Sequence, residues 1–154
     1  MIYFFMEFIT KNFKETQQLA ERLVEQLITA PHRGALVLAL RGDLGAGKTT
    51  FIQGLGKALG VKEKILSPTF VIMKHFNILS SDYFSDFYHL DCYRIESSGD
   101  LEVLNFKEII NEPKNLVVIE WAERIKKALP SDAVWLEFEH GGEDVRKIQI
   151  INYQ

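Results

Sequence analysis

The sequence predicts an α/β fold with a mixed, mostly parallel central sheet, helices on both of its faces in three layers, and a C-terminal hairpin. Three observations support this prediction. Residues 35–40 and 116–119 are short, wholly apolar segments, as in strands buried on both faces of a parallel sheet. Residues at helical spacing precede the first segment, over 12–28, and follow it, over 48–59. Alternating residues around Gly141-Gly142 indicate the terminal hairpin.

Length and composition favour one domain over residues 1–154. The 154 residues are 47% hydrophobic and 25% charged, which suffices for a buried core and excludes disorder as the main state. The formal net charge of -3 gives no general attraction to nucleic acid or to an anionic membrane. An RNA partner would therefore need a local basic patch or an intermediary protein.

The cysteine count and the N-terminal segment predict a cytoplasmic protein. Cys92 is the one cysteine, so no internal disulfide can form, and the four histidines have no zinc-ligand spacing. Residues 1–9 are apolar but lack a basic start and are interrupted by Glu7, so we expect a strand and not a signal peptide. No apolar run approaches the roughly 18 residues that would span a bilayer.

The remaining elements follow in order. Asn12 and Glu15 resemble a capping box at the start of the first helix, which Pro31 and Gly34 end. Gly60 ends the second helix. Beyond it we expect strands at 71–76 and 87–90 that form a hairpin, one or two short helices over 100–110 after the Ser97-Ser98-Gly99 break, a strand at 116–119, a short helix at 122–129, and hairpin strands at 134–138 and 145–151.

The loop between the first apolar segment and the second helix carries a phosphate-binding motif. The run GDLGAGKT at 42–49 matches G-x-x-x-x-G-K-[ST] in full, which a chain this long would do by chance roughly half a per cent of the time. Its glycines let backbone N–H groups face a phosphate, while Lys48 would reach the β- and γ-phosphates and Thr49 would bind Mg²⁺. The motif predicts a P-loop NTPase-like domain. The expected nucleotide-binding residues are Asp43, Leu44, Gly45, Ala46, Gly47, Lys48, Thr49 and Thr50.

Two acids stand at predicted strand ends where they could assist the loop. Glu120 follows four apolar residues, as in a Walker B strand with Glu in place of Asp, and would complete the metal site. Asp91 ends the predicted strand at 87–90 and could orient the attacking water or reach the metal through water. The alternative for either acid is a solvated side chain at a strand end. His89 is equally consistent with a strand histidine whose hydrogen bonds are satisfied.

Five further residues are candidates for a switch or a partner contact. Ser67 and Thr69 flank Pro68 after the P-loop helix, where a γ-phosphate-sensing switch often lies, although a simple turn is the alternative. Tyr93 and Arg94 could place a cation near the phosphates or toward a partner. Trp121 could stack on a ligand or a partner, or belong to the core.

Four motifs in order resemble those of the TsaE (YjeE) family of small bacterial P-loop ATPases: GDLGAGKTT at 42–50, SPTF at 67–70, HLDCYR at 89–94 and VIEW at 118–121. The resemblance implies ATP hydrolysis in the formation of threonylcarbamoyladenosine beside the anticodon of tRNAs that read codons starting with A. It also implies that the chain acts with the transferase TsaD and its partner TsaB, which would hold the tRNA. It assigns Mg²⁺ to Thr49 and Glu120, and a nucleotide or catalytic role to Asp91.

Two other functions remain open at this point. A small-molecule kinase also uses a P-loop, but it needs an acceptor pocket and usually an arginine-rich lid, and only Arg94, Arg124 and Arg146 are available, scattered along the chain's second half. An ATP-sensing module with negligible turnover is disfavoured by the presence of both Asp91 and Glu120. A GTPase is disfavoured because the chain has no N-K-x-D motif.

Overall fold

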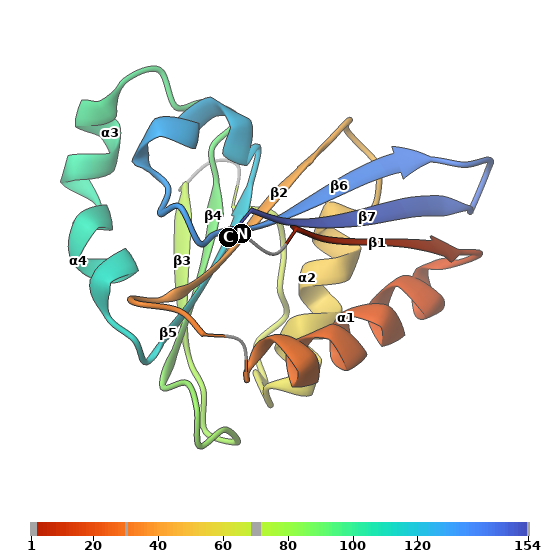
Figure 1. The fold of residues 1–154 in the computed structure, drawn as a ribbon, viewed down its shortest axis with the longest axis horizontal. Coiled ribbons are helices and arrows are strands. Elements are labelled where there is room, and N and C mark those ends of the chain that lie inside the picture. Colours follow the sequence, from red (N-terminus) through yellow and green to blue (C-terminus); the bar gives the residue numbers. More distant parts are fainter. Residues whose placement is uncertain (1–2, 30, 69–71, 154) are drawn as a thin grey trace.

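The computed structural model describes residues 3–29, 31–68 and 72–153 of the chain. These residues form seven strands in one sheet and five helical segments that cover both of its faces (Figure 1). The strands are β1 (Tyr3–Thr10), β2 (Leu36–Gly42), β3 (Met73–Asn77), β4 (Asp86–Asp91), β5 (Asn115–Glu120), β6 (Val134–His140) and β7 (Arg146–Tyr153). The helices are α1 (Phe13–Leu27), α2 (Lys48–Ala58), α3 (Ser98–Val103), α4 (Phe106–Asn111) and the 3₁₀ helix η1 (Ala122–Ala128).

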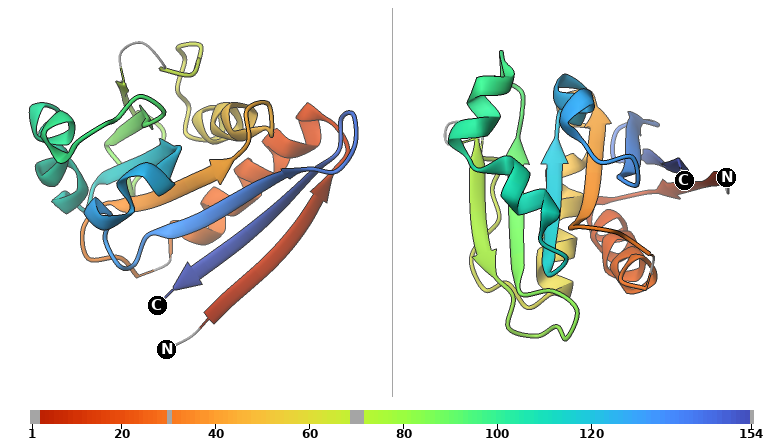
Figure 2. Two further views of the ribbon diagram at one scale, coloured as in Figure 1. Left: turned by 90° about the horizontal axis from the view of Figure 1, so that it is seen from above. Right: turned by 60° about the vertical axis from the view of Figure 1, so that its left-hand side comes forward.

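The sheet has a parallel centre and antiparallel edges. Its strand order is β1-β7-β6-β2-β5-β4-β3, and the adjacent strands β6, β2, β5 and β4 are parallel (Figure 2). At one edge β3 is antiparallel to β4, and at the other β7 is antiparallel to both β6 and β1. Among the described strands, only β3 and β7 run against the rest, so the predicted mixed, mostly parallel sheet and C-terminal hairpin are confirmed.

Strand β2 is apolar at consecutive positions because both of its faces are buried. Leu36, Leu38 and Leu40 pack in the core beneath α1 and α2, whereas Val37 and Ala39 pack in the core beneath α3, α4 and η1. Because successive side chains of a strand point to opposite faces, a strand covered on both sides must be apolar at every position. The three predicted layers follow from this double burial.

Helices α1 and α2 lie side by side on one face of the sheet (Figures 1 and 2). A Cβ atom added at Gly54 of α2 would lie 2.5 Å from the carbonyl oxygen of Gln17 in α1. The glycine therefore sets how closely the two helices approach. The start of α1 is capped as predicted, since the side chain of Asn12 accepts a hydrogen bond from the backbone N–H of Glu15.

Two local details differ from the prediction. The expected one or two helices over 100–110 are two, α3 and α4, separated at Asn105, which has φ +54°, but α3 starts at Ser98, inside the expected break, because Ser97 and Asp100 form a capping box. Residues 122–128 form a 3₁₀ helix interrupted by non-helical dihedral angles at Ile125. Each difference depends on backbone geometry that composition alone does not specify.

Two expectations about membranes and cysteine chemistry can be compared with this fold. None of the helices in the described part of the chain combines the length and apolarity needed to cross a bilayer. Cys92 is buried, and burial raises the pKa of its thiol to about 12. The thiol therefore stays protonated and packs as a small apolar side chain.

Candidate functional site

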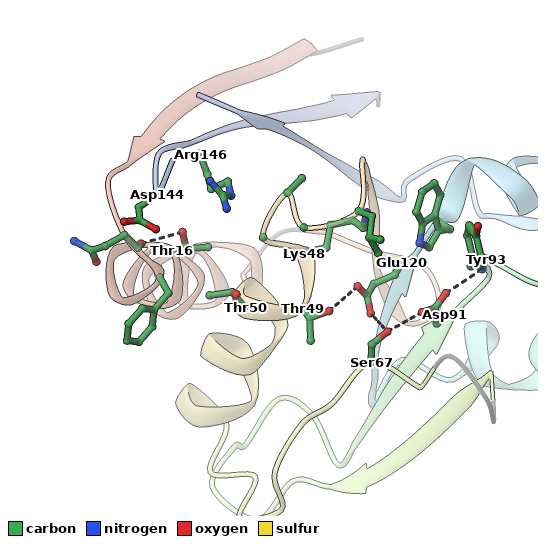
Figure 3. A pocket seen from close by; sticks show the side chains of 17 residues that line it. Thr16, Lys48, Thr49, Thr50, Ser67, Asp91, Tyr93, Glu120, Asp144 and Arg146 are labelled. Atoms are coloured by element: carbon green, nitrogen blue, oxygen red, sulfur yellow. Dashed lines mark hydrogen bonds between the residues drawn. The ribbon is translucent and has the colours of Figure 1, made fainter. Parts of the chain in front are cut away.

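A cavity of about 740 Å³ opens at the carboxyl ends of β2, β4 and β5 (Figure 3). This edge of a parallel sheet is where ligands of open α/β folds usually bind. Its lining includes the P-loop residues Leu44, Gly45, Ala46, Gly47, Lys48, Thr49 and Thr50, and the predicted residues Ser67, Asp91, Tyr93, Glu120 and Trp121. Asp43 is not among the lining residues, but its backbone carbonyl accepts a hydrogen bond from Lys48, and Thr69 lies outside the described residues.

The P-loop glycines are needed where the backbone turns into α2. Gly45 has φ +77° and Gly47, the N-cap of α2, has φ +101°, a region that L side chains rarely adopt. Gly47, Lys48 and Thr49 line the cavity, so the N-terminal end of α2 lies at it, and a helix N-terminus favours an anion. The loop therefore has the geometry of a phosphate cradle.

The ammonium group of Lys48 is held by two backbone carbonyls and an aromatic ring. It donates to the carbonyl oxygen of Gly42 and to that of Asp43 at 3.2 Å, and Nζ lies 4.3 Å from the centre of the Trp121 ring. Burial lowers the pKa of Lys48, and the charge of Glu120 opposes this effect in part. An anion entering the cavity would stabilise the protonated form that burial disfavours.

Two buried carboxylates face the loop from adjacent strands. Asp91 and Glu120 are paired in register on β4 and β5, and only 4% and 3% of their surfaces are exposed. The Oγ1 atom of Thr49 donates to Oε1 of Glu120 at 2.9 Å, and Oγ of Ser67 donates to Oδ2 of Asp91 at 2.7 Å (Figure 3). Their burial shows that the alternative of solvated strand-end acids is wrong.

Further hydrogen bonds fix the orientation of both acids. Oδ1 of Asp91 accepts the backbone N–H of Tyr93 at 2.9 Å, so the turn after β4 aims the carboxylate. Oε2 of Glu120 lies 3.3 Å from Oγ of Ser67 and 2.8 Å from Nε2 of the buried His89. Each carboxylate therefore has both of its oxygens in contact with a polar group.

The donor set fits Mg²⁺ better than it fits zinc. A hydroxyl and carboxylate oxygens are the ligands that Mg²⁺ prefers, and Thr49, Glu120 and Asp91 provide them at one edge of the cavity. Within the described ranges, no group of three or more His, Cys, Asp or Glu side chains could hold a metal alone.

The two aromatic residues near the acids form one wall of the cavity. Trp121 follows β5 in a left-handed conformation, φ +57°, and its ring lies 5.0 Å from that of Tyr93. The guanidinium of Arg124 lies 5.3 Å from the Tyr93 ring, whereas Arg94 is exposed and does not line the cavity. Trp121 thus belongs to the cavity wall while its partly buried surface packs against the core.

Five lining residues were not predicted. They come from the start of α1, from the β6–β7 connection and from the first residue of β7: Asn12, Phe13, Thr16, Asp144 and Arg146. Figure 3 shows Thr16, Asp144 and Arg146 at the end of the cavity opposite the acids. No motif marks them, because β7 and α1 reach the P-loop only through the order of strands in the sheet. The cap at Asn12 signalled a helix start without indicating a site.

Comparisons with known proteins agree on one family. Residues 10–148 match the family model TsaE, described as threonylcarbamoyl adenosine biosynthesis protein TsaE. The tRNA threonylcarbamoyladenosine biosynthesis protein TsaE of Bacillus subtilis is 36% identical over 139 residues, 90% of this chain and 80% of that protein. The protein of the same name from Aquifex aeolicus is 35% identical over 146 residues, 94% of each chain. The crystal structure of Bacillus subtilis YdiB matches with a TM-score of 0.74 and 28% identity, covering 100% of this chain and 89% of that one.

Proposed function

The chain belongs to the TsaE family, and we propose that it is a Mg²⁺-dependent ATPase that acts with TsaD and TsaB family proteins. In this proposal it supports the formation of threonylcarbamoyladenosine beside the anticodon of tRNAs that read codons starting with A. Its relatives are named for biosynthesis of this modified tRNA nucleoside. The P-loop cavity supplies the nucleotide-binding part of the proposal.

The observation that carries the ATPase proposal is the hydrogen bond between Thr49 and Glu120 at the edge of the P-loop. In P-loop NTPases, the hydroxyl after the P-loop lysine and an acid at a neighbouring strand end together hold Mg²⁺. We assign that role to Thr49 and Glu120. When bound, the ion would neutralise part of the charge on the β- and γ-phosphates. Residues 43–50 would surround those phosphates through backbone N–H groups and the Lys48 ammonium.

Asp91 is assigned to the attacking water. It is buried beside Glu120, yet its side chain is hydrogen-bonded to Ser67 and not to Thr49. A carboxylate in this place can accept a hydrogen bond from a water and set its direction. Lys48 would stabilise the charge that develops on the transferred phosphoryl group, so it serves both binding and catalysis.

The mouth of the cavity supports the proposed need for partner proteins. Phe13 and Leu44 line it with 72% and 86% of their surfaces exposed, and Tyr93 is also exposed. Exposed apolar side chains around a nucleotide site are typical of a surface that another protein covers. We assign Ser67, Thr69, Tyr93, Arg94 and Trp121 to a switch or contact region. Without a partner, water reaches the site freely and hydrolysis should be slow.

The remaining parts of the proposal concern the whole chain. Residues 1–154 would act as one domain in the cytoplasm, and the net charge of -3 supports contact with tRNA only through the complex.

The proposal is tested by measuring phosphate release from ATP by the chain alone and with TsaB and TsaD. We expect slow hydrolysis alone, acceleration with the partners, and tighter association when ATP is present, because coupling between binding sites is reciprocal. Thr49→Val should raise the Mg²⁺ concentration required for hydrolysis, whereas Thr29→Val, which removes a surface hydroxyl bonded to the carbonyl of Gln26, should not. Partner binding without any effect of nucleotide or any change in turnover would contradict the proposal. Phosphate transfer to a small acceptor without partners would do so as well.

A further inference from the structure

His89 is a buried histidine to which the proposed ATPase assigns no role. It lies on β4, two residues before Asp91, and its side chain is fully buried. Its Nε2 atom lies 2.8 Å from Oε2 of Glu120 on the neighbouring strand β5. A carboxylate oxygen accepts hydrogen bonds, so the imidazole donates this one through Nε2–H.

The surroundings of the second ring nitrogen, Nδ1, also indicate that the proton of His89 is on Nε2. Nδ1 is buried and has no hydrogen-bond partner among the residues that the structure describes. A neutral ring with its proton on Nε2 leaves only a lone pair unpaired at Nδ1. A proton on Nδ1 would leave a buried donor unsatisfied, which costs more free energy. The surroundings of the ring therefore provide for one donated hydrogen bond, and Glu120 receives it.

We propose that His89 is a positioning residue for Glu120, an inference that rests on the proposed role of Glu120 as a Mg²⁺ ligand. The bond to Oε2 restricts rotation of the carboxylate and keeps Oε1 directed at the hydroxyl of Thr49. Without it, the terminal torsion of a glutamate side chain is broad. Ser67 is a poor substitute as donor, because it lies 3.3 Å from Oε2 and donates to Asp91 at 2.7 Å.

The expected size of the effect follows from other metal sites. Groups that hydrogen-bond a metal ligand fix its direction and its basicity, and their loss typically weakens metal affinity roughly 10- to 100-fold. A histidine needed only for packing would instead lower the stability of the fold and leave the Mg²⁺ dependence unchanged. The two roles therefore predict different measurements.

Two polar substitutions at His89 test the roles of the two ring nitrogens separately. In His89→Gln the side-chain amide can take the place of Nε2–H and donate to Glu120, whereas in His89→Asn the amide reaches only as far as Nδ1. Phe87→Leu is the matched control, because Phe87 is buried on the same strand two residues earlier and faces the same side of the sheet. The full chain is titrated with a non-hydrolysable ATP analogue by calorimetry at a series of Mg²⁺ concentrations, and the folded fraction of each variant is checked by circular dichroism.

We expect His89→Asn to raise the Mg²⁺ concentration for half-maximal binding about tenfold, with His89→Gln within about threefold of the parent chain. Phe87→Leu should leave that concentration unchanged. With TsaB and TsaD present, hydrolysis by His89→Asn should show the same shift in Mg²⁺ dependence, with a smaller change in kcat at saturating Mg²⁺.

Either of two results would overturn the assignment of His89: parental Mg²⁺ dependence in His89→Asn, or a His89→Gln chain as impaired as His89→Asn. If the parent chain bound the analogue without any Mg²⁺ dependence, the proposed function itself would fail. The experiment therefore distinguishes the two failures.

Discussion

Lys48 is a residue whose buried charge lowers the stability of the nucleotide-free fold. Its pKa is lowered by burial, so the folded chain binds this proton less tightly than the unfolded chain does. Stability therefore rises with pH in the window between the lowered pKa and the ordinary lysine value of 10.5. At neutral pH the charged group destabilises the nucleotide-free fold, Glu120 offsets this in part, and a bound anion would offset it further.

Lys48→Met tests this balance. The substitution keeps an unbranched side chain over Trp121 and removes the charge. We expect the Tm of the nucleotide-free chain at pH 7 to stay equal or rise, and the binding of ATP to fall below detection, because the β- and γ-phosphates lose their cation. Thermal unfolding and calorimetry measure the two effects. Retained ATP affinity in this variant would contradict the phosphate-cradle assignment.

Substitutions of Asp91 and Glu120 should have different effects on the kinetics of ATP hydrolysis. Glu120→Gln is expected to raise the Mg²⁺ requirement, and Asp91→Asn to lower hydrolysis roughly 100-fold with ATP affinity largely kept, since one acid serves the metal and the other the water. Asp86→Asn is the control, because Asp86 lies at the other end of β4, paired with His75. Phosphate release with TsaB and TsaD present, measured over a range of Mg²⁺ concentrations, would show the difference. Equal behaviour of all three variants would return both acids to a structural role.

At the scale of elements, the contact between α1 and α2 depends on Gly54. A methyl group there would meet the backbone of Gln17, which cannot move without displacing α1. We expect Gly54→Ala to lower the free energy of unfolding by about 1–3 kcal/mol despite the better helix propensity of alanine. It should also weaken ATP binding, because the N-terminal ends of α1 and α2 both contribute to the cavity lining.

Urea unfolding of Gly54→Ala and Gly99→Ala separates steric overlap from propensity. A methyl group at Gly99 in α3 would meet only Oγ of Ser97, at 3.6 Å, so this control should be neutral or slightly stabilising. Equal stability of the two variants would show that α1 yields to the added methyl group.

The sequence predicted those features of the fold that depend on residues close together along the chain. The P-loop could be predicted because a phosphate cradle is built from consecutive residues, and β2 and β5 because burial on both faces requires apolar residues at every position. The contact between His89 and Glu120 joins residues 31 positions apart, and no pattern within either strand announces it. Arg146 reaches the cavity only because β7 lies between β1 and β6, an order that the sequence does not state.

At the scale of the whole molecule, the net charge of -3 and the pI near 5.8 predict a low affinity of the isolated chain for tRNA. We expect the chain alone to show no saturable binding below about 10 µM to a fluorescently labelled tRNA at about 0.15 M salt, because phosphate contacts supply most non-specific affinity. Fluorescence anisotropy, with and without TsaB and TsaD, measures this. Binding by the isolated chain at nanomolar concentration would mean that it touches tRNA directly, through a local patch of its basic side chains.

The pairing of β1 with β7 has a consequence for synthesis on the ribosome. Of the described strands, β1 leaves the ribosome first and β7 last, and their register joins Tyr3 to Tyr153. The parallel strands β2, β4 and β5 are complete once residue 120 has emerged, so they can assemble while β1 still waits for its neighbour. Contacts between residues so distant along the chain form slowly. The exposed side chains of Phe5 and Ile9 are therefore carried on an unpaired strand during that interval, when a chaperone would have the most to bind.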